Sequence, residues 1–174
     1  MAVLPIIVAP DARLKAKCAP VERVDSGIRK LMDDMVETME LAPGIGLAAP
    51  QVGVKKRVIV VDVTPSGEPR NPIRMANPEI VWASEERIAF EEGCLSLPDQ
   101  FAEVARAARI RVRYLDHENE IRELEANDLL ATCIQHEMDH LDGVLFVDHI
   151  SALRRSIILR RLQKEKKAKA LAQA

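Results

Sequence analysis

The H-E-x-x-H pentapeptide at residues 136–140 constrains the fold more than any other feature of this chain. Apolar residues around it recur with helical spacing, from a cap at Asn127 or Asp128 to Leu141, and Gly143 follows as a helix stop. Histidines four residues apart on a helix lie about 40° apart around its axis, so both can reach one metal ion. Two buried imidazoles without a partner would be costly, and a bound metal ion would supply that partner.

The residues of the pentapeptide have separate predicted roles. His136 and His140 are candidate metal ligands, and Glu137, offset by about 100° around the helix, is a candidate general base for a bound water. Leu129 and Cys133 share the stripe of the two histidines, which indicates that this face is turned inward. The alternative interpretation is a pair of core histidines beside an exposed glutamate.

A catalytic metal site needs a third protein ligand and an open position. The longer metalloprotease pattern would place a histidine at position 146, where this chain has Phe146. We favour Cys94, in the turn-like segment 92–98 (E-G-C-L-S-L-P), because Gly93 lets the backbone approach closely and a thiolate is a good metal ligand. The alternatives are Cys18, Cys133, Asp148 and His149.

Residues 44–51 (G-I-G-L-A-A-P-Q) form a third segment of interest. Its small residues would let the backbone of a ligand approach closely, and the Gln51 amide could donate a hydrogen bond to an oxyanion. The alternative is a helix stop followed by a tight loop packed against the core.

The remaining patterns predict an α+β fold. Helical spacing predicts a helix over residues 25–39, capped by Asp25 or Ser26, and a last helix from Ser151 towards Ala170. Strands are predicted at 57–63, 73–76, 79–84, 109–114 and 121–124, with a turn at 117–119. Because strands and helices are segregated, we expect mostly antiparallel sheets around the H-E-x-x-H helix, plus an N-terminal and a C-terminal helix.

Length and composition predict a single catalytic domain over residues 1–174, with residues 151–174 as its basic C-terminal helix. A net charge of −2, and only one Trp, one Tyr and three Phe, argue against DNA binding. We find no membrane-length apolar run and no secretory signal, so no membrane partner is expected. Three cysteines, an odd number, indicate a reducing compartment.

Together the three segments resemble the motifs of peptide deformylases, G-x-G-L-A-A-x-Q, E-G-C-L-S and Q-H-E-x-D-H-L-x-G. They match residues 44–51, 92–96 and 135–143 at every specified position and in the same order. The resemblance covers essentially the whole chain, and the long basic C-terminal helix is similar to that of the bacterial class. It implies a hydrolase that removes the formyl group from N-formylmethionine of newly synthesised polypeptides and releases formate.

The resemblance also implies roles for individual residues. Cys94, His136 and His140 would hold one divalent metal ion, Fe²⁺ in the cell, with Zn²⁺, Ni²⁺ or Co²⁺ able to occupy the site in preparations. Glu137 would be the acid/base for attack of a metal-bound water on the formyl carbon, and Gln51 and the backbone N–H of Leu95 would form the oxyanion hole. The implied substrate-binding residues are Gly44, Ile45, Gly46, Phe90, Gly93, Leu129 and Cys133, of which Ile45, Phe90, Leu129 and Cys133 line the methionine pocket.

One position departs from the family pattern. Many bacterial members have an arginine three residues after the proline of the cysteine-containing loop, where this chain has Phe101. We therefore expect Arg106 to supply a cation near the far end of a bound peptide.

Two rival functions stay open. One is a zincin-like endopeptidase with an acidic residue or His149 as third ligand. The other is a nucleic-acid or ribosome-binding module, because residues 151–174 carry eight Lys and Arg against one Glu. The resemblance joins this second function to the enzyme, since it implies that the basic helix docks on ribosomal RNA in the bacterial cytoplasm.

Overall fold

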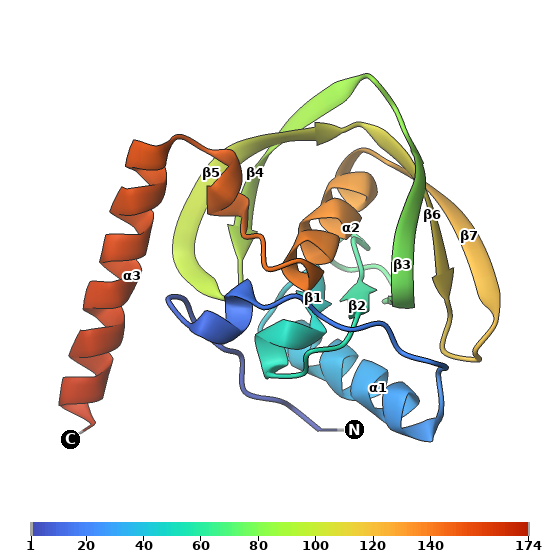
Figure 1. The fold of residues 1–174 in the computed structure, drawn as a ribbon, viewed down its shortest axis with the longest axis horizontal. Helices are drawn as coiled ribbons and strands as arrows, with labels where there is room; N and C mark the ends of the chain where they lie inside the picture. The colour runs from blue at the N-terminus through green and yellow to red at the C-terminus, as the bar shows by residue number, and fades with distance from the viewer. Residues whose placement is uncertain (1, 174) are drawn as a thin grey trace.

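Helix α2 (Asp128–Leu141), which carries the H-E-x-x-H pentapeptide, lies at the centre of the fold and contacts strands of two antiparallel sheets (Figure 1). This computed structural model describes residues 2–173. The larger sheet has the order β1-β2-β3-β6-β7, and the smaller one pairs β4 with β5. The strands are β1 (Gly46–Ala48), β2 (Val58–Val61), β3 (Ile73–Ala83), β4 (Arg87–Cys94), β5 (Leu97–Ala107), β6 (Arg109–Leu115) and β7 (Ile121–Asn127).

The helices begin and end close to the predicted residues. The side chain of Asp25 caps α1 (Ser26–Leu41) by accepting a hydrogen bond from the Ile28 N–H. Gly143, at φ 74°, follows the end of α2, and an added Cβ there would collide with the Lys15 carbonyl. The other helical elements are α3 (Ala152–Ala172) and the 3-10 turns η1 (Ala12–Lys15), η2 (Ala49–Val52) and η3 (Phe146–His149).

Strand β2 is buried on both faces, as its continuous β-branched run predicts. Ile59 and Val61 pack with residues of α2, whereas Val58 and Val60 pack with the methionines of α1. The two cores on either side of the sheet are therefore separated by a single layer of strands, and α2 is held against one face of that layer.

Residues 73–83 form one strand, where the sequence predicts two extended segments. Asn77 has φ 49°, and the register between β3 and β6 shifts between Ala76 and Glu79. This irregularity interrupts the alternation of side chains, which is why the two halves of β3 read as separate strands.

The β4–β5 hairpin corrects the sequence analysis, which treats residues 92–98 as a turn. Only Leu95 and Ser96 lie between the two strands, and Cys94 pairs with Leu97 at the tip. The inward positions of this hairpin include Glu92, Gln100 and Arg106. Polar residues at buried positions hide the apolar alternation on which strand prediction depends.

Helix α3 lies along the outside of β5, with its C-terminal end away from the rest of the fold (Figure 1). Its buried residues, Ile158 and Leu162, belong to a third core that also contains Leu97, Val104 and Phe146. Within residues 2–173, no helix combines the length and the apolar character that crossing a membrane requires.

Candidate active site

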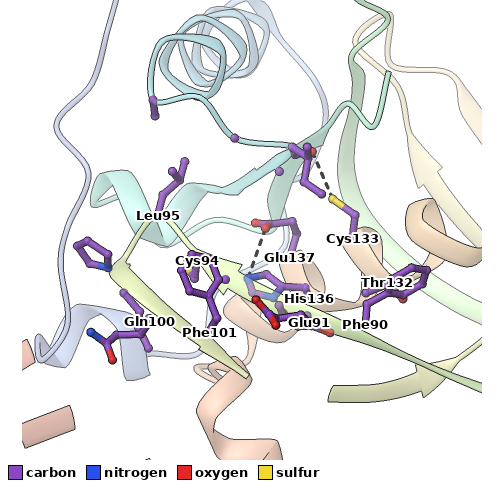
Figure 2. A pocket seen from close by; sticks show the side chains of 18 of the residues that line it. Phe90, Glu91, Cys94, Leu95, Gln100, Phe101, Thr132, Cys133, His136 and Glu137 are labelled. Atoms are coloured by element: carbon purple, nitrogen blue, oxygen red, sulfur yellow. Dashed lines mark hydrogen bonds and ion pairs between the residues drawn. The ribbon is translucent and has the colours of Figure 1, made fainter. Parts of the chain in front are cut away.

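The structure brings together one thiol and two imidazoles from distant parts of the chain. Cys94 ends β4, whereas His136 and His140 lie one turn apart on α2, and one ligand atom from each of the three residues lies within 4.8 Å of the others. The Cys94 Sγ is 3.4 Å from the His140 Nε2. Both histidines are buried and Cys94 is partly exposed. Cys94 and His136 line a pocket (Figure 2).

The donor atoms of this cluster fit a transition-metal ion. The Nδ1 of His136 donates to the Glu92 carboxylate over 2.8 Å, which leaves its Nε2 free to act as a ligand. Burial, with His136 and Arg106 nearby, holds the pKa of His140 well below its usual value and keeps this imidazole neutral. Burial opposes protonation of His136, but its contacts with Cys94 and Glu92 raise the pKa of this imidazole well above its usual value. A metal ion would bind both imidazoles in the neutral form, and a thiolate sulfur with two imidazole nitrogens is a ligand set that zinc and iron accept.

Glu92 belongs to a buried charge network that the sequence analysis missed. Its two carboxylate oxygens accept from the Nε and Nη2 of Arg106 over 2.7 and 3.0 Å, and the Nη1 of Arg106 donates to Asp139 over 2.8 Å. Arg106 is only 5% exposed. The expectation that Arg106 meets the far end of a bound peptide is therefore wrong. Its buried guanidinium binds Glu92 and Asp139, and Glu92 in turn accepts a hydrogen bond from His136.

Glu137 is 4% exposed, and burial raises the pKa of its carboxyl to about 7. Its Oε1 is 3.7 Å from the His136 Nε2, and its Oε2 has no hydrogen-bond partner within the described chain. Gly46 makes this position possible, because a Cβ there would lie 2.8 Å from the Glu137 Cγ. A carboxyl group beside the cluster, with one free oxygen, can accept and return a proton near neutral pH.

Gln51 is held in a fixed orientation next to Cys94. Its Oε1 accepts from the Ala48 N–H over 2.9 Å, and its Nε2 donates to the Ser96 hydroxyl over 3.0 Å. The same Nε2 is 3.5 Å from the Cys94 Sγ. Among the turn and loop hydrogen bonds between residues 2 and 173, none has the backbone N–H of Leu95 as its donor. Gln51 thus lies beside Cys94, and Leu95 is the residue that follows Cys94 in the chain.

A pocket of about 620 Å³ opens in front of the cluster. Cys133 lies on its wall with its Sγ 3.3 Å from the Ile45 carbonyl, and burial raises the pKa of this thiol. Thr132, which the sequence analysis did not single out, also lines the pocket, and its buried hydroxyl has no partner among residues 2–173. All the predicted substrate-binding residues line this pocket: Gly44, Ile45, Gly46, Phe90, Gly93, Leu129 and Cys133.

The alternative third ligands lie outside the cluster. The Nε2 of His149 is 2.8 Å from Asp139, and Asp148 pairs with Lys15 and Arg155. Cys18 is buried in the core beneath the sheet. Within the described residues, Cys94, His136 and His140 form the one group of His, Cys and acidic side chains close enough to hold a metal ion.

An α+β chain with an inward-facing H-E-x-x-H helix and a thiol beside it is typical of metallohydrolases. The family model described as polypeptide deformylase matches residues 3–156. The peptide deformylase of Rhizobium meliloti (strain 1021) is 53% identical over 97% of this chain and 97% of its own length, and that of Methylocella silvestris is 55% identical over 96% and 87%. The crystal structure of peptide deformylase from Ehrlichia chaffeensis has a TM-score of 0.92 and 40% identity, and the match covers 97% of this chain and 99% of that one.

The chain belongs to the polypeptide deformylase family. Members of this family remove the formyl group from the N-terminal methionine of nascent peptides. The predicted enzyme class and the predicted antiparallel α+β fold are thereby confirmed.

Proposed function

We propose that Cys94, His136 and His140 hold one divalent metal ion, and that this centre hydrolyses the formyl group of N-formylmethionine and releases formate. The observation that supports this proposal best is the convergence of a thiol and two imidazoles beside Glu137 in a pocket. We propose Fe²⁺ in the cell, with Zn²⁺, Ni²⁺ or Co²⁺ as substitutes in preparations. Such an ion, when bound, would lower the pKa of a water and polarise the formyl oxygen.

Glu137 is the general base and acid of the proposed reaction. Its unpartnered Oε2 takes the proton of the attacking water and then delivers it to the amine of methionine, which leaves as the free N-terminus. A carboxyl pKa of about 7 suits both transfers, because the group loses and gains a proton readily near neutral pH.

Gln51 and Leu95 stabilise the oxyanion that forms when water adds to the formyl carbon. The Gln51 amide is already oriented by Ala48 and Ser96, so it pays little reorganisation cost during the reaction. The backbone N–H of Leu95, at the tip of the β4–β5 hairpin, supplies the second donor. Loss of one such donor typically lowers the rate by about 10²–10³.

The peptide substrate binds as an extended strand between β1 and β4. Each strand pairs on one side only, β1 with β2 and β4 with β5, and residues of both line the pocket. Backbone pairing with Ile45, Gly46 and Gly93 would tolerate many side chains after methionine. The methionine side chain enters the part of the pocket lined by Ile45, Phe90, Leu129 and Cys133.

Glu137→Gln tests the catalytic proposal. We expect the variant to retain the metal content of the native protein, measured by elemental analysis after anaerobic purification, because the proposed ligands are intact. Formate release from a formyl-Met peptide should fall by about 10²–10⁴. Glu165→Gln, an exposed position on α3, is the matched control. Turnover near the native rate would remove Glu137 from the base role.

We further propose that the basic α3 docks on the ribosome in the bacterial cytoplasm, where formylated chains emerge. Deleting residues 151–174 would also remove Ile158 and Leu162 from the core. Replacing the exposed Lys164, Lys167 and Lys169 with Gln is therefore the better test. Salt-sensitive ribosome binding should weaken while activity on a short peptide persists. Unchanged ribosome affinity would refute docking through α3.

A further inference from the structure

A second groove, of about 420 Å³, lies between the beginning of β5 and α3. Residues 99–101 line both this groove and the active-site pocket, so the two spaces share one wall. The Phe101 ring lies against Gly93, where an added Cβ would be 2.7 Å from its Cε1, and Gly93 precedes Cys94. The groove therefore continues the pocket on the other side of Phe101.

The groove combines apolar surface with unpaired positive charge. Phe101 is 56% exposed and Ile157 is 41% exposed. Arg154 and Arg161 lie seven residues apart on α3, hence on the same side of the helix, and both line the groove. Neither guanidinium forms an ion pair with any residue from 2 to 173, in contrast to Arg155, which pairs with Asp148.

Asp99 is the acidic residue among those that line the groove. It is exposed, and no ion pair with Arg154 or Arg161 forms within the described chain. The two arginines thus leave a net positive charge next to apolar surface. A carboxylate on an extended chain with small or apolar neighbours complements this combination.

We propose that this groove is a downstream subsite for the polypeptide substrate, and that it selects chains carrying an Asp or Glu, or the terminal carboxylate, beyond the first residues after formylmethionine. The inference rests on the proposed function, because the occupant is the part of the same substrate that leaves the pocket beside Phe101. Arg154 and Arg161 attract the substrate carboxylate, whereas Asp99 repels it. The exposed faces of Phe101 and Ile157 contact the residues next to that carboxylate.

The expected selectivity is modest, because both arginines are exposed. Ion pairs between exposed groups typically contribute about 0.2–1 kcal/mol each, so two arginines correspond to a preference of roughly 2- to 30-fold. The preference should weaken with added NaCl, which screens exposed charges.

The experiment compares formyl-Met-(Ala)n peptides with amidated C-termini, in which one Ala at a time is replaced by Asp. The native protein should show a higher kcat/KM for Asp at one position or two neighbouring positions. Arg154→Gln/Arg161→Gln should remove this preference and leave kcat/KM for formyl-Met-Ala-Ala amide unchanged. Arg160→Gln, a neighbouring exposed arginine outside the groove, is the control and should retain the preference. Asp99→Asn should increase it.

The outcomes separate the two proposals. If formyl-Met-Ala-Ala amide is not deformylated by the metal-loaded protein, the proposed function itself fails. If it is deformylated but no Asp position raises kcat/KM, or the double variant retains the preference, the subsite is refuted. Loss of ribosome binding by the double variant with an unchanged peptide profile would likewise overturn the subsite and assign the two arginines to RNA.

Discussion

Replacing Arg106 should destabilise the protein, because the buried Glu92 carboxylate loses the guanidinium that compensates its charge. Arg106 and Glu92 each have side chains that are 5% exposed, and two hydrogen bonds join them. In Arg106→Met, the Glu92 carboxylate retains His136 as its remaining side-chain partner. Breaking a buried pair by removing one partner typically costs about 3–5 kcal/mol. For a chain of this size that corresponds to a fall in Tm of roughly 6–20 °C.

The assay is urea unfolding at one fixed free-metal concentration, because metal bound to the folded state adds to the apparent stability. Arg113→Met is the matched control: its pair with Glu123 spans 3.9 Å with both side chains about half exposed, so its loss should cost less than about 1 kcal/mol. The double variant Arg106→Met/Glu92→Gln no longer buries an uncompensated charge and should be more stable than Arg106→Met alone.

Two results would refute this reasoning. The first is a loss of less than about 1 kcal/mol in Arg106→Met, which would mean that water or rearrangement compensates the carboxylate. The second is a double variant that is less stable than Arg106→Met, which would place the cost in lost packing of the long side chain rather than in charge.

The remaining predictions concern the cluster, the pocket and the contacts of α3. Cys94→Ala should lose both bound metal and activity in elemental analysis and formate assays, whereas Cys18→Ala should keep both; retention by the first variant would exclude the thiolate ligand. Gly46→Ala should lower kcat about 10²-fold or more, because the added methyl group would displace Glu137. A native kcat would contradict this and would mean that β1 shifts to accommodate the methyl group. Thr132→Val should raise the free energy of unfolding by about 1 kcal/mol, because it removes a buried hydroxyl without a partner, and a loss of stability would contradict this. Burial opposes ionisation of Asp148, but the Leu145 N–H, Arg155 and Lys15 together hold its pKa below the ordinary value. Asp148→Asn should therefore be less stable than the native protein at pH 7, and the difference should shrink as pH falls below about 4; a difference that is constant with pH would refute the charge-based account.

Local patterns predicted the helices and most of the larger sheet because their signals lie within short windows of sequence. The cap at Asp25, the stop at Gly143 and the β-branched run of β2 each depend on neighbouring residues. The β4–β5 hairpin escaped prediction because its inward face carries Glu92 and Arg106, whose burial makes sense only once they pair with each other.

The sequence by itself determined the donor types and their spacing on one helix, since four residues on α2 place His136 and His140 side by side wherever that helix lies. The sequence favoured Cys94 as the third donor, but only the tertiary structure brings its Sγ to His140, because that approach depends on how the β4–β5 hairpin packs against α2. The tertiary structure also shows that Arg106, which the sequence predicted to contact the substrate, is a buried partner of Glu92. The physical reason is that alternation along a strand is local, whereas the identity of the opposing surface is a property of the packed chain.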